Sequence, residues 1–134
     1  EKVVFIKSNK TDSHECNSSW SKEWGDNVEE KTLFLKHILE TTKLPSCLID
    51  VDCLFLKDFS QLINFDSDIG LCDRHYSSDS KYIASFFYCN YTKNAFDFLN
   101  DWILEQTKIK SYPKETKCLN LTYKKYFGKI KIQN

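Results

Sequence analysis

Two aspartates that follow an apolar run, Asp50 and Asp52 in "CLIDVD" (47–52), are the residues of this chain best suited to chemistry. Residues i and i+2 of an extended chain point to the same side, so we expect both carboxylates to face one spot. Carboxylates this close repel each other unless a cation lies between them, and a hard divalent ion such as Mg²⁺ takes oxygen ligands. Because Mg²⁺ is usually held by one or two carboxylates plus substrate phosphates, the pair predicts a metal site for a phosphate-bearing ligand. The alternative is that the two acids are solvated or cap the next segment.

The segment that must position these acids reads as a strand over residues 46–52, "SCLIDVD". Its hydrophobicity is continuous up to the acids rather than alternating, which indicates a strand buried on both faces, as in a parallel sheet. Ligands of open α/β sheets bind at the carboxyl ends of the strands. The pattern therefore predicts a ligand site at the end of this strand.

The rest of the chain alternates between strand and helix patterns. Helix 26–42 starts with Asp26 and Glu29 at the spacing of a capping box, and Thr92 can cap the helix that follows it. Further strands are predicted at 3–7, 68–73, 81–91 and 129–133, and further helices at 56–63, 93–106 and 117–127. The alternation predicts an α/β fold with a mixed, mostly parallel sheet.

The composition narrows the class of protein. The 134 residues, with 41% hydrophobic and 15% aromatic content, suit one folded domain over 1–134. Nineteen basic against nineteen acidic residues argue against a nucleic-acid partner. No apolar run reaches the roughly 18 residues of a membrane span. Six cysteines without a CxxC pair favour buried free thiols in a reducing, cytoplasmic setting, with a disulfide framework as the alternative.

The stretch "LIDVDCLFLKDFSQLI" (48–63) resembles the D-x-D segment of nucleotide-diphospho-sugar glycosyltransferases with the GT-A fold. The resemblance continues through "DIGLCDR" (68–74), residues 82–102 and "ETKCLN" (115–120). It implies a minimal GT-A-like, Rossmann-like sheet flanked by helices. It also implies an enzyme that moves a sugar from a nucleotide-sugar donor, with a UDP-sugar favoured, to an unidentified hydroxyl acceptor.

The resemblance also implies roles for individual residues. Asp50 and Asp52 would bind Mn²⁺ or Mg²⁺ and, through it, the donor diphosphate, and Asp50 would also face the ribose. Glu115 takes the place of an acid near the reacting sugar, which makes it the candidate base or sugar-binding acid. The remaining donor-binding candidates are Phe5, Lys7 and Ser8 near the base, Ala84 and Ser85 near the sugar, and Asp73 with Arg74, whose fork suits phosphate.

Other interpretations stay open. The chain is shorter than familiar members of that family, so it could be a degenerate GT-A module that binds a nucleotide or a partner without turnover. "DVDCLF" resembles the opening of haloacid-dehalogenase-type phosphatases, but Cys53 and Leu54 stand where those have other residues. A sugar-nucleotide pyrophosphorylase would need a Gly-rich loop, and the chain has 3 glycines. A homo-oligomer is one way in which so small a domain could complete its acceptor site.

Overall fold

The computed structural model describes residues 22–134 except 55, 57, 59, 75–79 and 111–113. The strand predicted at 3–7 lies outside the described residues. Helix α1 (Lys22–Thr42) begins four residues before the predicted start, so Asp26 lies inside the helix rather than at its cap. The helix ends at Lys43, whose φ of 57° is left-handed and whose N–H donates to the Leu39 carbonyl at 2.9 Å. Pro45 then prevents continuation.

Strand β1 (Ser46–Ile49) is shorter than the predicted strand 46–52. The Asp50 N–H donates to the carbonyl of Ser85, and the Cys53 N–H donates to the carbonyl of Asp50 at 3.0 Å. This second bond closes a turn, and Val51 and Asp52 lie exposed within it. The prediction that the two aspartates share one side of an extended strand is therefore wrong. The expected burial of both strand faces is also wrong, because only Leu48 in β1 is buried.

The four described strands form one sheet in the order β1-β3-β2-β4, with β2 at Ile69–Asp73, β3 at Tyr82–Cys89 and β4 at Ile132–Gln133. Strand β3 is antiparallel to both β1 and β2, and only β2 and β4 pair in parallel. The mixed α/β class is confirmed, but the expectation of a mostly parallel sheet is wrong for these strands. Strands β2 and β3 are separated by only eight residues, 74–81, and such short connections favour antiparallel neighbours.

The sheet contains an irregularity that keeps its apolar face continuous. Leu71 of β2 pairs with Phe87 of β3, whereas the next residue, Cys72, pairs with Ile83. The three residues of β3 between these partners bulge out of the ladder. Because the bulge shifts the alternation by one, Tyr82 and Phe87 both face the core although their spacing is odd.

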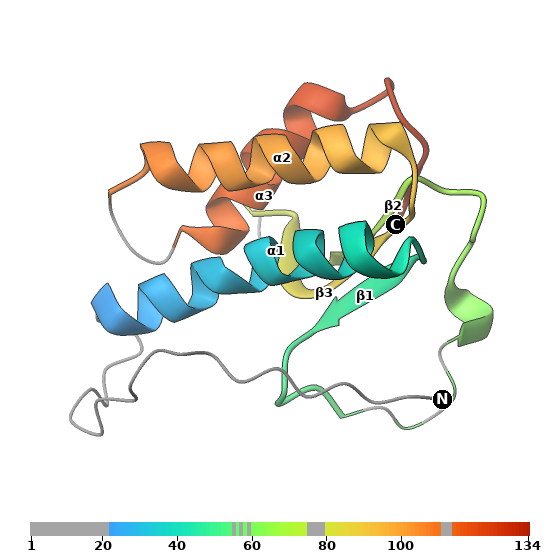
Figure 1. Cartoon of the computed structure of the whole chain (residues 1–134), viewed down its shortest axis with the longest axis horizontal. Coiled ribbons are helices and arrows are strands. Elements are labelled where there is room, and N and C mark those ends of the chain that lie inside the picture. The colour runs from blue at the N-terminus through green and yellow to red at the C-terminus, as the bar shows by residue number, and fades with distance from the viewer. Residues whose placement is uncertain (1–21, 55, 57, 59, 75–79, 111–113) are drawn as a thin grey trace.

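Helices α2 (Lys93–Lys108) and α3 (Glu115–Tyr126) correspond to the helices predicted at 93–106 and 117–127. Thr92 caps α2 as predicted, with its Oγ1 accepting from the Ala95 N–H at 3.2 Å. The helix predicted at 56–63 is reduced to a short 3-10 turn, η1 (Ser60–Leu62). Helices α1 and α2 run side by side, and α3 packs against α2 (Figure 1).

One core joins the three helices to one face of the sheet. Its buried members are Leu35, Leu39, Leu48, Ile69, Leu71, Tyr82, Ala84, Phe87, Cys89, Ala95, Phe98, Leu99, Trp102, Cys118 and Leu119. The ring of Phe87 in β3 stacks on Phe98 of α2 at 5.8 Å and meets Trp102 edge-on at 5.1 Å. Among the described residues, no helix combines the length and the hydrophobicity needed to cross a membrane.

Candidate functional site

Three charged side chains from three different elements meet beside the end of β1. The Lys31 ammonium of α1 lies 2.6 Å from Asp50 Oδ1 and 3.1 Å from Glu115 Oε1. The Lys31 and Asp50 side chains are each 26% exposed, and Glu115 is 10% exposed. We call Lys31, Asp50 and Glu115 the charged cluster. It brings together two acids that the sequence had singled out from distant segments.

Local structure explains why each member of the cluster lies there. Lys31 comes one helical turn before Leu35, so it continues the stripe of α1 that packs on the core. Asp50 is held by the backbone bond to Ser85 described above. Glu115 opens α3, and its carbonyl accepts a hydrogen bond from the indole N–H of the buried Trp102 at 3.1 Å.

A second ion pair of opposite polarity joins the same two helices. Lys114, which precedes α3, lies 2.5 Å from Glu29 of α1. The Lys114 side chain is almost fully buried, and Glu29 is three-quarters buried. Along α1 the acid Glu29 precedes the base Lys31. At the start of α3 the base Lys114 precedes the acid Glu115, so each charge meets its opposite. This pattern fixes how the two helices meet, and with it the position of Glu115.

The charged cluster shifts the proton affinity of its members. Burial raises the pKa of Glu115 to about 7, against the opposing effect of the Lys31 ammonium, and the nearby charge of Asp50 adds to the rise. Burial lowers the pKa of Lys31, but its hydrogen bond to Asp50 and the charge of Glu115 outweigh burial and raise the pKa above its ordinary value. Glu115 can therefore exchange a proton near neutral pH, which is what a general acid or base requires.

Asp52, the other predicted metal ligand, lies in the exposed turn after β1 and forms no ion pair with any described residue. Within the described part of the chain, no three His, Cys, Asp or Glu side chains form a ready-made metal cage. Asp50 and Asp52 belong to one turn, and a hard divalent ion prefers carboxylate oxygens together with oxygens of substrate phosphates. The Lys31 ammonium is an alternative to a metal ion as the charge that compensates Asp50, because the two groups already form an ion pair.

The predicted donor-sugar residues Ala84 and Ser85 lie in the bulge of β3 next to Asp50. The Ser85 carbonyl accepts from the Asp50 N–H at 2.9 Å and from the Cys53 thiol at 3.6 Å, so Ser85 adjoins the charged cluster. The Ala84 side chain instead belongs to the core, where it is 1% exposed. Asp73 ends β2, and the Arg74 N–H donates to the Lys81 carbonyl. Phe5, Lys7 and Ser8 lie outside the described residues.

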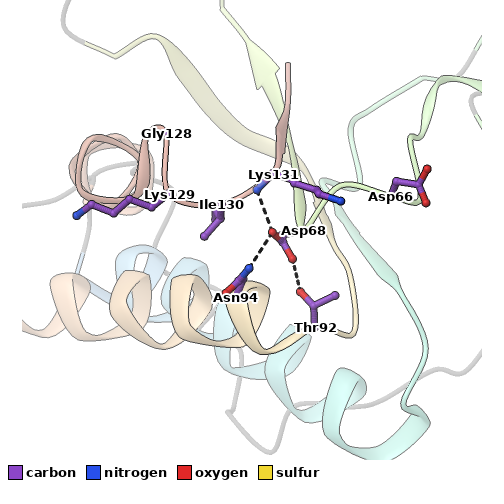
Figure 2. A pocket seen from close by; sticks show the side chains of 8 residues that line it. All are labelled: Asp66, Asp68, Thr92, Asn94, Gly128, Lys129, Ile130 and Lys131. Carbon is purple, nitrogen blue, oxygen red and sulfur yellow. Dashed lines mark hydrogen bonds between the residues drawn. The ribbon is translucent and has the colours of Figure 1, made fainter.

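A pocket lies away from the charged cluster, between the start of α2 and the chain that enters β4 (Figure 2). It encloses about 550 Å³ and centres on Asp68. That carboxylate accepts from the Thr92 hydroxyl at 2.6 Å, the Asn94 amide at 3.2 Å and the Lys131 N–H at 2.9 Å. Burial raises the pKa of Asp68, but these hydrogen bonds outweigh it and hold the pKa below its ordinary value. Asp68 therefore acts as a structural link between β2, α2 and β4.

The sequence interpretation missed Lys31, although a signal was present. A lysine four residues before Leu35 and eight before Leu39 continues a core-facing stripe, and a lysine on such a stripe needs an acidic partner. Free thiols are confirmed for the described cysteines, but their predicted burial holds only for Cys89 and Cys118, because Cys47, Cys53 and Cys72 are partly exposed. Cys16 lies outside the described residues.

Comparison of the chain with family models, with curated proteins and with solved structures finds no match. The charged cluster and its surroundings therefore carry the functional argument by themselves.

Proposed function

We propose that this chain is a metal-dependent glycosyltransferase that moves a sugar from a nucleoside diphosphate sugar, with UDP favoured, to a hydroxyl acceptor. One observation carries the proposal: the Lys31 ammonium pairs with both Asp50 and Glu115. From two distant segments, the sequence assigned Asp50 to the donor metal and Glu115 to the reacting sugar. Both residues must lie in one site for that assignment to work, and their shared ion pair supports it.

The donor half of the site would be built on the turn after β1. Asp50 and Asp52 would hold Mn²⁺ or Mg²⁺, which when bound acts as a Lewis acid that stabilises the leaving nucleoside diphosphate. Lys31 adds a positive charge beside Asp50, which suits a ligand that carries two phosphates. The Ser85 carbonyl restrains Asp50 through the backbone and so preorganises the turn.

The acceptor half would depend on Glu115. A carboxyl whose pKa is about 7 is partly ionised at neutral pH and can take the proton of an acceptor hydroxyl. The Lys31 ammonium at 3.1 Å favours the ionised form, while burial favours the protonated form. Glu115 is thus poised to accept a proton when the sugar leaves the donor and to release it afterwards.

The second candidate, a module that binds a nucleotide without turnover, is favoured by the pairing of Lys31 with Asp50. That ion pair satisfies Asp50 without a metal ion, so the charged cluster can persist in a protein that has no catalytic use for one. Binding of UDP without turnover of any sugar donor would identify this candidate.

The first test is binding of UDP in the presence of Mn²⁺ or of EDTA, followed by thermal unfolding. A ligand at one hundred times its Kd adds about 2.7 kcal/mol to the free energy of unfolding, which is several degrees for a domain of this size. We expect a Mn²⁺-dependent rise in Tm for the wild type. Asp52→Asn should abolish the rise, whereas the control Asp66→Asn, a change at another exposed acid, should keep it.

Turnover is then measured as release of UDP from UDP-sugars. Glu115→Gln should lower the rate at least tenfold while it keeps the Mn²⁺-dependent binding of UDP, because proton transfer typically contributes about 10²–10⁴-fold. A rise in Tm that persists in EDTA or in Asp52→Asn would refute the metal assignment. Unchanged turnover in Glu115→Gln would refute the role of Glu115.

A further inference from the structure

The solvent-facing side of α3 carries lysines and apolar side chains and has no function in the proposed reaction. Lys117, Leu121, Lys124 and Lys125 follow the i, i+4, i+7, i+8 spacing of one helix face, and all four are exposed. The opposite side of the helix, with Cys118, Leu119 and Thr122, is buried. Helix α3 packs against α2 (Figure 1), and Lys125 lies at the edge of the exposed side, where it pairs with Asp101 of α2.

The charge of this region departs from that of the whole chain. Five lysines and no acid occur from Thr116 to Asn134, whereas the whole chain balances 19 basic against 19 acidic residues. Lys125 shares the Asp101 carboxylate of α2 with the Tyr126 hydroxyl, so its charge is partly neutralised. Lys117 and Lys124 have no such partner among the described residues. The exposed face of α3 is therefore locally positive on a protein without net charge.

Two large apolar side chains are exposed in this part of the chain, one on the helix face and one just after the helix. Leu121 is 42% exposed, and Phe127, which follows the last turn of α3, is 67% exposed. The Phe127 ring contacts the ring of Tyr123, which packs against the edge of the core, with centroids 5.6 Å apart. Lysines that flank exposed leucine and phenylalanine are typical of a surface that rests on a membrane, because the apolar groups enter the acyl boundary and the lysines meet anionic headgroups.

We propose that the exposed face of α3, defined by Lys117, Leu121, Lys124 and Lys125, together with Phe127 just after the helix, docks the protein on an anionic lipid surface. Charge complementarity carries the choice of partner, because a locally positive face without acids complements anionic headgroups. The apolar component distinguishes a bilayer from a nucleic acid. The chain's one arginine, the residue that reads phosphate backbones and bases best, follows β2 and does not belong to this face.

The test is co-sedimentation of the purified chain with vesicles of phosphatidylcholine alone or with 30 mol% phosphatidylglycerol, at low and at physiological salt. We expect binding to the anionic vesicles only, weakened by salt. Lys117→Ala/Lys124→Ala should weaken it at least tenfold. Leu121→Ser/Phe127→Ser should weaken binding to the anionic vesicles although it leaves the net charge unchanged. Circular dichroism confirms the fold of each variant.

The matched control is Lys36→Ala/Lys93→Ala, which removes a partly exposed lysine from α1 and an exposed lysine from α2, and so the same net charge. It should bind the vesicles like the wild type. Equal loss in this control, equal binding to neutral vesicles, or no binding to anionic vesicles at low salt would each overturn the proposal. Preferential binding of a single-stranded oligonucleotide over the anionic vesicles would overturn it as well.

Discussion

At the scale of single residues, the decisive feature is a lysine shared between two carboxylates. Lys31 lies within hydrogen-bond reach of both Asp50 and Glu115, in surroundings that are largely closed to water. Ions in such surroundings are tolerated when they are paired, and removal of one partner leaves a charge without compensation. Glu115 is the most buried member, and its elevated pKa reflects this burial.

The pKa of Glu115 predicts how stability depends on pH. Its ordinary value is 4.5 and its value in the folded protein is about 7, so between these pH values the folded state binds more protons than the unfolded state. The stabilisation that results is complete below about pH 4.5 and is lost as the pH rises through about 7. Urea denaturation of the wild type and of Glu115→Gln from pH 5 to pH 8 measures how the free energy of unfolding depends on pH.

In that experiment, the free energy of unfolding of the wild type should fall more steeply with rising pH than that of Glu115→Gln. Glu40→Gln, the same chemical change at an exposed position of α1, should keep the wild-type slope. Identical slopes for the wild type and Glu115→Gln would contradict an elevated pKa at this position.

At the scale of elements, the attachment of α3 to the sheet depends on one amide. Strand β1 pairs with residues 86–89 of β3 and does not reach Tyr82. The Asn120 Oδ1 accepts from the Tyr82 N–H at 2.9 Å, and its Nδ2 donates to the Tyr82 carbonyl at 2.7 Å. The side chain of Asn120 therefore replaces a neighbouring strand at that edge. The same Nδ2 also donates to the Thr116 carbonyl within α3.

We predict that Asn120→Leu lowers the free energy of unfolding by about 2–4 kcal/mol. The substitution keeps a similar volume but leaves the buried N–H and carbonyl of Tyr82 without partners, and each unpaired group costs about 1–3 kcal/mol. The matched control is Asn100→Leu on the exposed side of α2, which should stay within about 0.5 kcal/mol of the wild type. Chemical denaturation measures both, and similar stability of the two variants would refute this role of Asn120.

At the scale of the whole molecule, aromatic contacts unite the layers into one core. Phe98 of α2 is fully buried, stacks on Phe87 of β3 and meets Tyr126 of α3 at 5.3 Å. Leu39 of α1 and Leu48 of β1 belong to the same cluster. Because helices and strands share this core, we expect them to unfold together.

The change Phe98→Ala should lower the free energy of unfolding by about 3–5 kcal/mol, because it removes buried surface and leaves a cavity that touches three elements. Phe34→Ala on α1, where the ring is 40% exposed, should cost much less. Far-UV circular dichroism and tryptophan fluorescence should report the same midpoint in the wild type. Separate midpoints, or equal effects of the two substitutions, would argue against a single core.

Local patterns predicted the helices better than the sheet. Thr92 and the apolar face after it were enough to locate α2, because capping and helical periodicity involve neighbours in sequence. The strands predicted within the described residues correspond to observed ones, but the predicted strand 46–52 is longer than β1, which ends at Ile49. The predicted strand included Asp50, Val51 and Asp52, whereas the backbone turns at Asp50, whose N–H donates to the Ser85 carbonyl and whose carbonyl accepts from the Cys53 N–H. The start of α1 was misplaced because the residues before Asp26 were assigned to a loop.

The sequence by itself determined the α/β class, the approximate place of most described helices and strands, and Asp50 as a residue to examine, while a family resemblance added Glu115. Only the tertiary structure decided that β3 pairs antiparallel on both sides and that Lys31 joins Asp50 to Glu115. Caps and periodicity arise from residues within a few positions of each other, so they can be read along the chain. Strand neighbours and ion-pair partners arise where distant segments meet, and burial then sets the proton affinity of the groups that meet there.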